Sequence, residues 1–540
     1  MHPYVAEQFS DEEAGILRRY VTNLDQPVFA LVNLPEVVKG ALFARYSRSP
    51  KSLRRLFLDE FVGDLDVTGD VTFDATVGLK RAEALYERVF YEYGDDSVAQ
   101  LGGVHLACEQ SSNLLTKILE RGRLMSYLEQ STRYLAYDQR LPSGHYRYFR
   151  PPGVLDSPLG ARYVGDMDRM FDTYGLLLGE VQAWLHARYP KAPGDSDFVH
   201  RQAVRAKALD AVRGVLPAAS LSNVGIYGTG QGYEQLLLRM RAHPLPEARA
   251  YAQMMLVELR KVIPSFLRRV DVEDRGVAWS DYLATTREGT ARVVERLFPA
   301  DVDADPDPPE VRLLDFDPDG EDKVLAAACF AHVSGSEAAV LARVRALSAE
   351  ERTALLTAYV GDRENRRHRP GRALERTDYR FELVTDYGAF RDLQRHRLLT
   401  VEWQPLSCAL GADVPVTVTE AGSGALFGES LARSSDLFDA IRAHLPDEAG
   451  YAVALAFRIR YILQMNAREA MHVLELRSGP QGHPAYRRVA QEMHRQIASV
   501  AGHHALAAAM RHVDYEDSDL ERLEGERRAE ARRFERSQGG

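Results

Sequence analysis

The triplet Arg395-His396-Arg397 places two guanidinium groups and an imidazole within three residues. A guanidinium binds phosphate through two parallel hydrogen bonds, so this triplet suits a phosphorylated ligand. In a strand, Arg395 and Arg397 would share one face, whereas in a turn all three side chains could surround one anion. A solvated run of charges is the alternative interpretation.

The segment Asn466 to Arg477 contains strong helix formers and no helix breaker, which predicts a helix. Its two end residues are about three helical turns apart, so Asn466 and Arg477 lie on one face. Arg468 and His472, four residues apart, share a neighbouring face. The helix can therefore offer an amide, two guanidiniums and an imidazole towards one side. An ordinary amphipathic helix is the alternative.

In the first half of the chain, Glu129, Ser131 and Arg133 alternate and would face the same way in an extended segment. An arginine beside a serine hydroxyl can hold a phosphate, and Glu129 can accept a hydrogen bond from a sugar hydroxyl. A half-exposed strand with polar residues on its wet side is the alternative.

The run from Arg363 to Arg372, RENRRHRPGR, is the most basic stretch of the sequence. It does not alternate with aromatic residues, as a single-stranded nucleic-acid surface would. Its position near the Arg-His-Arg triplet suggests contact with a charged cofactor, with a solvated loop as the alternative. We find no phosphate-binding loop, no dinucleotide motif and no zinc signature, and we expect neither a metal site nor a nucleic-acid partner.

The composition is that of a globular protein: 540 residues with 45% hydrophobic and 27% charged content. The 68 Lys and Arg residues against 78 Asp and Glu leave a net charge of −10, which argues against a general nucleic-acid-binding role. The apolar runs are too short for a membrane helix, and the first residues do not resemble a secretory signal. Because three cysteines cannot form a disulfide framework, we expect a cytoplasmic protein without membrane association.

Similar short sequences occur in the same order on both sides of an Asp- and Pro-rich stretch. FARYSRS (43–49) pairs with FAHVSGS (330–336), and ERGRLMSY (120–127) pairs with QRHRLLTV (394–401). This order indicates a diverged tandem duplication. The predicted divisions are an N-terminal domain (1–298), a linker (299–322), a C-terminal domain (323–513) and a charged tail (514–540).

The secondary-structure signals are mixed along the chain. Apolar residues have helical spacing in Tyr163–Tyr189 and Ser435–His444, whereas Tyr379–Val384 and Val414–Val418 alternate as strands do. The tail should form a solvated helix that frays at its end. We therefore predict an α+β fold in which each of two tandem domains has a mixed or antiparallel sheet packed with long helices.

These motifs resemble the signature of the flavin-dependent thymidylate synthases (the ThyX type), in which Arg-His-Arg is followed by Ser, Asn-Glu, Ser and Arg-Tyr. The first half departs from that signature at Gly122 and Leu128, where the family has His and Asn. The second half keeps the triplet but has Trp403, Pro405 and Ser407 where the family has Glu, Ser and Arg. The first half matches the family at Arg121, Arg123, Ser126, Glu129, Ser131, Arg133 and Tyr134.

The Asn466–Arg477 helix resembles a later motif of the same family, in which Asn and Arg contact flavin and a terminal Arg holds the uracil. Arg213, shortly before a Leu-Pro pair, matches an arginine that reaches the nucleotide phosphate. Glu375 stands where the family has an acid near the flavin, and Gln100 is its counterpart in the first half. The matches are complementary, because the first half retains the nucleotide loop and the second half the flavin cluster.

The resemblance implies specific roles for these residues. Arg477 and Ser131 would act in catalysis, and the substrate would be held by Glu129, Ser131, Arg133, Arg213 and Arg477. FAD would be held by Arg395, His396, Arg397, Asn466, Arg468, His472 and Glu375.

The reaction that the resemblance implies is transfer of a one-carbon unit from methylenetetrahydrofolate to C5 of dUMP, with FAD as cofactor and NADPH as reductant, to give dTMP. A homodimer would reproduce the four domains of the family's tetramer. Two alternatives stay open: a non-catalytic flavin- or nucleotide-binding homologue, and a flavin enzyme acting on a different pyrimidine nucleotide.

Overall fold

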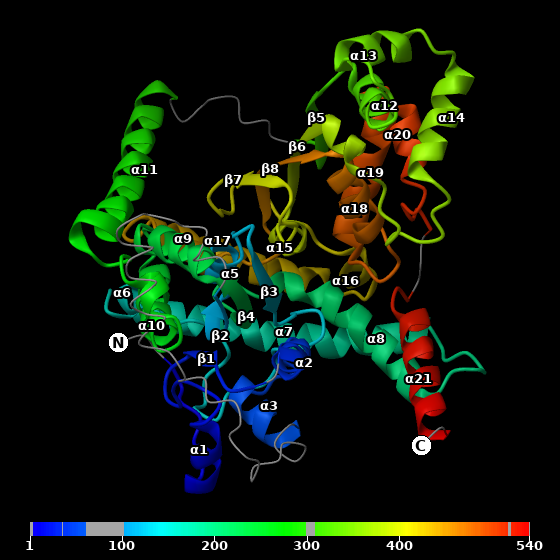
Figure 1. The fold of residues 1–540 in the computed structure, drawn as a ribbon. Helices are drawn as coiled ribbons and strands as arrows, with labels where there is room; N and C mark the ends of the chain where they lie inside the picture. Colours follow the sequence, from blue (N-terminus) through cyan, green and yellow to red (C-terminus); the bar gives the residue numbers. More distant parts are fainter. Residues whose placement is uncertain (1–3, 35, 61–101, 299–307, 517–519, 539–540) are drawn as a thin grey trace. The chain divides into compact units, whose positions relative to one another are not determined.

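The computed structural model describes residues 4–34, 36–60, 102–298, 308–516 and 520–538 (Figure 1). It contains two four-stranded antiparallel sheets with the same strand order. The first sheet has the order β1-β2-β4-β3, formed by β1 (Val28–Leu31), β2 (Gly103–Ser112), β3 (Met125–Glu129) and β4 (Leu221–Thr229). The second has the order β5-β6-β8-β7, formed by β5 (Val311–Phe316), β6 (Asp378–Asp386), β7 (Thr400–Trp403) and β8 (Arg458–Asn466).

The helices of the first part of the chain are α1 (Asp11–Leu17), α2 (Glu36–Tyr46), α3 (Leu53–Glu60), α5 (Asn113–Leu119), α6 (Pro152–Leu155), α7 (Gly160–Arg188), α8 (Asp197–Val212), α9 (Gly230–Arg241), α10 (Pro246–Arg260) and α11 (Ala278–Leu297). Those of the second part are α12 (Gly320–Phe330), α13 (Glu337–Arg345), α14 (Ala349–Val360), α15 (Tyr387–Leu393), α16 (Val416–Glu420), α17 (Gly424–Arg442), α18 (Ala467–Arg477), α19 (Pro484–Ser499), α20 (His504–Ala509) and α21 (Leu523–Gln538). The α+β prediction and the repeated architecture are confirmed.

The two central strands of each sheet end in a residue that caps the next helix. Ser112 caps α5 and Thr229 caps α9, whereas Asp386 caps α15 and Asn466 caps α18. In each case the side-chain oxygen accepts a hydrogen bond from a backbone N–H of the first turn, which would otherwise lack a partner. The repeated unit is therefore a pair of strand-to-helix connections, and these connections position the candidate site.

The chain divides into two compact units, each containing sequence from both halves. Unit 1 comprises residues 1–175, 215–304 and 432–454, and unit 2 comprises residues 176–214, 305–431 and 455–540. Arg213 consequently belongs to unit 2, together with the second sheet. The domain boundaries expected from the sequence remain a prediction.

Several local predictions can be compared directly with the structure. The helices predicted at Tyr163–Tyr189 and Asn466–Arg477 and the strand at Tyr379–Val384 are confirmed as α7, α18 and β6. The strand predicted at Val414–Val418 is wrong, because Pro415 stands at the N-cap of the short helix α16. Alternation of Val with Pro and Thr therefore gave a false strand signal.

Two charged segments are more ordered than their composition indicated. The second part of the predicted linker forms β5 and the beginning of α12, while residues 299–307 lie outside the described residues, as does Gln100.

In the tail, α21 lies beside α8 (Figure 1). Arg527 of α21 forms a bidentate ion pair with Asp195, which stands just before α8, at 2.6 and 2.9 Å. The tail is therefore docked within unit 2 and is not simply solvated.

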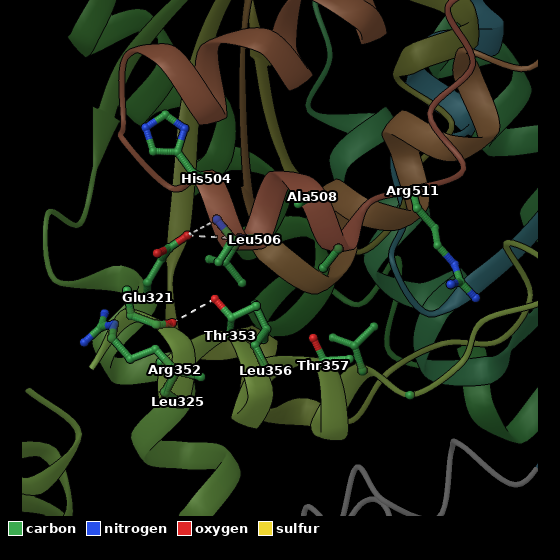
Figure 2. A pocket seen from close by; sticks show the side chains of 15 residues that line it. Glu321, Leu325, Arg352, Thr353, Leu356, Thr357, His504, Leu506, Ala508 and Arg511 are labelled. Atoms are coloured by element: carbon green, nitrogen blue, oxygen red, sulfur yellow. Dashed lines mark hydrogen bonds between the residues drawn. The ribbon is translucent and has the colours of Figure 1, made fainter. Parts of the chain in front are cut away.

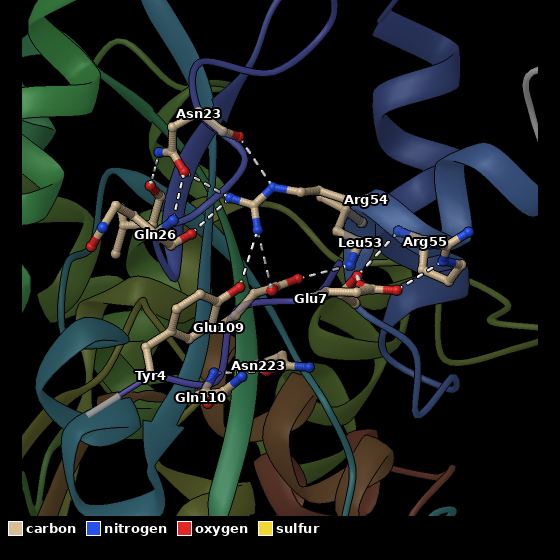
Figure 3. A network of polar contacts seen from close by, with 12 residues as sticks. Tyr4, Glu7, Asn23, Gln26, Leu53, Arg54, Arg55, Glu109, Gln110 and Asn223 are labelled. Atoms are coloured by element: carbon tan, nitrogen blue, oxygen red, sulfur yellow. Dashed lines mark hydrogen bonds and ion pairs between the residues drawn. The ribbon is translucent and has the colours of Figure 1, made fainter. Parts of the chain in front are cut away.

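Unit 1 contains a buried polar network around Arg54, whose side chain is 0% exposed (Figure 3). Its guanidinium donates to both Asn23 and the backbone oxygen of Gln26, and Nη1 lies 3.9 Å from Glu109 Oε2. Glu109 also accepts hydrogen bonds from the hydroxyl of Tyr46 and the backbone of Leu53. Because a buried charge is tolerated only when it is paired, this network is structural.

In the described part of the chain, every helix is too short or too polar to cross a lipid bilayer.

Candidate functional site

The Arg-His-Arg triplet forms a turn between α15 and β7 in unit 2. The two arginines lie towards solvent, with the Arg395 side chain 33% exposed and Arg397 exposed, whereas His396 is buried. The three side chains therefore do not present one flat surface. The imidazole lies below the turn, where it can bind residues of α18.

His396 is held between Arg477 and Glu469, both from α18. Arg477 Nε donates to His396 Nε2 at 2.8 Å, and His396 Nδ1 lies 3.6 Å from Glu469 Oε1. A guanidinium can only donate, so Nε2 is the acceptor and a neutral His396 carries its proton on Nδ1, facing the carboxyl group. This chain of contacts fixes both the imidazole tautomer and the orientation of Arg477.

The pKa values in this cluster favour neutral imidazole rings. Burial, reinforced by Arg477, holds the pKa of His396 well below its usual range. Burial and the nearby Arg369 lower the pKa of His472 to about 4. Burial raises the pKa of Glu469 to about 7, so this carboxyl group can hold or release a proton near neutrality.

Asp392, in the last turn of α15, lies between two arginines. Arg395 Nη1 lies 3.7 Å from Asp392 Oδ1, and Arg213 Nη1 lies 3.6 Å from Oδ2. Asp392 also acts electrostatically on Arg477. One carboxylate thus gathers Arg213, which the first half of the sequence supplies, with two arginines of the second half.

Arg213 is 4% exposed, and its Nη2 atom has no hydrogen-bond partner among the described residues. It lies against the beginning of α15, where a Cβ atom on Gly388 would come 3.0 Å from Nη2. The same Cβ atom would lie 2.8 Å from Asp386 Oδ1, so any larger residue at position 388 would have to push these two side chains away. A buried guanidinium nitrogen without a partner is costly, and an anionic ligand would satisfy it.

The remaining predicted flavin residues line α18 and the segment before β6. Asn466 Oδ1 caps α18 by accepting from Glu469 N at 2.9 Å, which leaves its amide nitrogen as a donor. Arg468 Nη1 lies 3.1 Å from Glu375 Oε1. From the basic run, Arg369 Nη2 lies 3.1 Å from His472 Nδ1. The structure thus brings all the predicted flavin residues into unit 2.

The basic run has a mixed role. Arg363 is buried and forms a bidentate ion pair with Glu475 of α18, with both distances at 2.6 Å. Arg366 and Arg367 are exposed. The beginning of the run therefore anchors the loop on α18, and its middle adds positive charge beside His472.

His396, Glu469 and His472 have the residue types of a metal site, and one ligand atom from each lies within 4.8 Å of the others. A neutral imidazole has one lone pair, and Arg477 and Arg369 already occupy those of His396 and His472. A cation would have to displace two guanidinium groups from a positively charged surrounding. The arginines around these three residues therefore suit an anion better than a metal ion.

The predicted nucleotide residues other than Arg213 belong to unit 1. Glu129 ends β3 and is buried, and its Oε2 lies 3.2 Å from Lys117 Nζ. Ser131 Oγ accepts from the backbone N–H of Arg133 at 3.2 Å, and the Arg133 side chain is buried. These three residues form one continuous segment, and Arg213 is not part of it.

Unit 2 also contains a half-open pocket of about 570 Å³ between α12, α14 and α20 (Figure 2). Its walls include Leu325, Leu356 and Leu506, with Arg352 and Arg511 at its margin. None of the residues predicted from the sequence to bind ligand lines it. Nothing in its lining indicates a chemical role.

Sequence reasoning missed the two acids that organise the site, Asp392 and Glu469. Asp392 stands three residues before Arg395, a spacing that brings side chains together on a helix and was a usable signal. Glu469 lies inside the Asn466–Arg477 segment, but only the fold shows that it is buried against His396.

The chain thus combines a duplicated α+β architecture with a cluster of arginines around Asp392 in unit 2. The family model described as "Thymidylate synthase complementing protein" matches residues 50–265 and 312–503, so the chain belongs to that family. The resemblance to flavin-dependent thymidylate synthases, as a tandem-duplicated member, is thereby confirmed.

Three curated relatives match this chain over 90% or more of its length. A UPF0159 protein of Chlamydia muridarum is 39% identical over 97% of this chain and 99% of its own, and one of Chlamydia pneumoniae is 38% identical over 97% and 98%. The UPF0159 protein Ta1429 of Thermoplasma acidophilum is 31% identical over 90% of this chain and 97% of its own. These names describe no activity.

Proposed function

We propose that this protein is an FAD-dependent thymidylate synthase that transfers a one-carbon unit from methylenetetrahydrofolate to C5 of dUMP, with NADPH as reductant, to give dTMP. The observation that carries the proposal is the gathering of Arg213, Arg395 and Arg477 around Asp392. Asp386 also acts electrostatically on Arg213, so three guanidiniums face at most two carboxylates, and the excess positive charge that remains suits a phosphorylated ligand.

The residues of unit 2 fit a flavin dinucleotide. The partly exposed Arg395 and the exposed Arg397 can meet its phosphates, and Arg213 Nη2, which has no hydrogen-bond partner among the described residues, is a further donor for an anion. Further contacts would come from His396, Asn466, Arg468, His472 and Glu375. When bound, the flavin supplies the hydride chemistry, and the protein supplies binding, orientation and electrostatics.

Arg477 is the proposed catalytic residue of unit 2. Its Nε is fixed by His396 and its guanidinium also interacts with Tyr486, and the remaining N–H groups of the Nη nitrogens would donate to a uracil oxygen as negative charge develops on the pyrimidine. The Glu469 carboxyl group holds the proton of His396 Nδ1 in place, so Arg477 keeps its orientation. A preoriented donor of this kind does not have to reorganise during the reaction.

In unit 1, Ser131, Arg133 and Glu129 are the proposed nucleotide residues, with Ser131 also acting in catalysis. The support is their position in one short segment directly after β3. We infer that the chain self-associates as a homodimer, which would supply four copies of the repeated architecture. Light scattering of the purified protein would measure the mass of the assembly.

Two experiments test the proposal. The purified protein should show a flavin absorption spectrum, and a colourless protein that cannot bind added FAD would overturn the proposal. Arg395→Ala should lower flavin content and leave dUMP binding unchanged, whereas Arg133→Ala should do the reverse. A flavin-loaded protein that does not act on dUMP would favour either the non-catalytic homologue or a different pyrimidine nucleotide.

A further inference from the structure

The helix α11 of unit 1 is attached to the rest of its unit by its first half only. Ser280 is its one buried residue. Ser280 Oγ donates to the backbone oxygen of Leu238 at 3.3 Å, and Arg287 donates to the backbone oxygen of Ala242. Residues 290–298 are all exposed, and the helix extends away from α9 and α10 (Figure 1). The second half of α11 therefore buries no side chain against the described part of the chain.

The apolar residues of α11 form one stripe along the helix. Steps of four and three residues connect Trp279, Leu283, Thr286, Thr290, Val293 and Leu297. At about 100° per residue, these positions fall within a sector about 80° wide, which we call the apolar stripe. The hydroxyls of Thr286 and Thr290 donate to backbone oxygens of the preceding turn, which leaves their methyl groups for apolar contact. This spacing is the seam of a two-helix coiled coil.

The apolar stripe is too exposed to belong to the core of unit 1. Trp279 is 47% exposed and Leu297 is 61% exposed, and Tyr282, at the edge of the stripe, is 64% exposed. A contiguous exposed apolar surface with a polar rim is typical of an interaction site. A short helix without packing is also only marginally stable in water, so the second half of α11 needs a partner to stay helical.

The charges of α11 restrict the kind of partner. The helix carries three acids and three arginines, namely Asp281, Glu288, Glu295, Arg287, Arg292 and Arg296. A helix that lies on an anionic membrane has an excess of basic residues on its polar face, and so does a nucleic-acid-binding surface. A polar face with balanced charges does not favour either of these, and it suits a protein partner.

A second copy of α11 fits the apolar stripe in the antiparallel orientation. The facing pairs are then Trp279 with Leu297, Leu283 with Val293, and Thr286 with Thr290 of the second copy. All of these pairs share position 288 as their midpoint, so one two-fold axis forms each pair twice, as an isologous contact requires. At the edge of the stripe, Arg296 comes near the ring of Tyr282 of the second copy, which is a favourable cation–π arrangement.

The antiparallel orientation also suits the way in which α11 is attached. It places the attached half of each helix beside the exposed half of the other, so both exposed halves gain a packing partner. A parallel pair would leave each exposed half beside the other and would bring the attached halves of both copies to the same end.

We propose that two copies of this chain associate through α11, as an antiparallel pair of helices that buries the apolar stripe. The contact uses none of the residues assigned to FAD or dUMP. It is one specific surface for the homodimer inferred above, and a homodimer formed through another surface would leave the proposed function intact.

Sedimentation equilibrium of the purified full-length protein tests the proposal. Wild type should be a dimer. The double variant Val293→Glu with Leu297→Glu should raise the dissociation constant of the dimer at least about 100-fold, because apolar burial is lost and charges enter the contact. Both residues are exposed in unit 1, so the helical circular dichroism of the whole protein should stay nearly unchanged.

The matched control is Thr285→Glu with Ala291→Glu. It adds the same charge at two exposed positions of α11 outside the apolar stripe and should leave the dimer intact. A monomeric wild type, an intact dimer in the Val293→Glu, Leu297→Glu variant, or equal weakening by the control would overturn the proposal. Absence of a flavin spectrum with the dimer behaving as expected would contradict the proposed function alone.

Disulfide trapping tests the orientation of the two helices. Thr286→Cys and Thr290→Cys proteins should form a cross-linked dimer when they are mixed, allowed to exchange subunits and oxidised, because these positions face each other only between copies. Neither variant alone should cross-link beyond the wild type, whose native cysteines provide the background. Efficient cross-linking of Thr286→Cys alone, or none in the mixture, would overturn the antiparallel contact.

Discussion

Unit 1 and unit 2 share the same pair of strand-to-helix connections but have different residues at two corresponding positions, the turn before the third strand and the end of the second helix. In unit 2, His396 in the turn binds Arg477 at the end of α18. In unit 1, Gly122 occupies the turn, and Met240 stands as far beyond the cap of α9 as Arg477 stands beyond the cap of α18. Met240 is fully buried. The corresponding positions therefore form a polar pair in unit 2 and a buried apolar helix end in unit 1.

The same contrast holds for the buried arginines. Arg54 in unit 1 donates to Asn23, Gln26 and Tyr4 and faces Glu109, so its charge is compensated (Figure 3). Arg213 in unit 2 has one ion pair at 3.6 Å and an electrostatic interaction with Asp386, and within the described part of the chain its Nη2 atom has no hydrogen-bond partner. A compensated buried arginine stabilises the fold, whereas an uncompensated one is available to a ligand.

The largest expected effect is at Arg54. Arg54→Met should lower the free energy of unfolding by about 3–5 kcal/mol, because it leaves Glu109 buried without a cation. Chemical denaturation measures this change. The double variant Arg54→Met with Glu109→Gln should recover part of the loss. Arg213→Met should cost less stability, and an equal loss would remove the contrast between the two arginines.

The second effect is on activity. Arg477→Met should reduce turnover of dUMP by about 100- to 1,000-fold, the range found when one fixed donor to a developing charge is removed. Met240→Leu, at the corresponding position of unit 1, conserves volume and should leave turnover nearly unchanged. Steady-state kinetics on both variants checks this difference. Similar losses in the two variants would show that the two helix ends are not functionally distinct.

The third effect concerns the pH dependence of stability. Burial raises the pKa of Glu247, which supports the cap of α5 in unit 1, to about 7, and that of Asp386, which caps α15 in unit 2, to about 6. Since the folded state holds these protons more tightly than the unfolded state, stability falls as pH rises from about 4 through these values.

Glu247→Gln should remove about 3 kcal/mol of this fall between pH 4.5 and 7.5, as a shift of that size implies. Asp386→Asn should remove a comparable part at a slightly lower pH. Thermal unfolding at several pH values measures both slopes. An unchanged pH dependence of stability in both variants would show that these two carboxyl groups do not cause the fall in stability with rising pH.

The smallest effect is at the turn of unit 1. Gly122→Ala should cost about 1–3 kcal/mol, because the new methyl group would meet the Tyr127 hydroxyl at 2.5 Å. Adding Tyr127→Phe should relieve the contact and restore stability, apart from the lost hydrogen bonds to Gly122. A stable Gly122→Ala variant would mean that the turn can accept a side chain. Denaturation midpoints of the single and double variants decide between these outcomes.

Sequence patterns predicted the features that depend on local spacing. The duplication and α18 follow from motif order and helix propensity, and both are present. The grouping of Arg213 with Arg395 was not predicted, because no local pattern shows that residues 176–214 pack with the second sheet. The docking of α21 on α8 was missed for the same reason: its ion pairs join residues more than 300 positions apart.

The central claim is that the arginine cluster of unit 2 supports thymidylate synthesis. Tritium release from 5-tritiated dUMP, with NADPH and methylenetetrahydrofolate, measures this reaction on the flavin-loaded protein. We expect tritium in water at a rate that requires both co-substrates and is lost in Arg477→Met. A protein that binds flavin but releases no tritium under these conditions would contradict the claim.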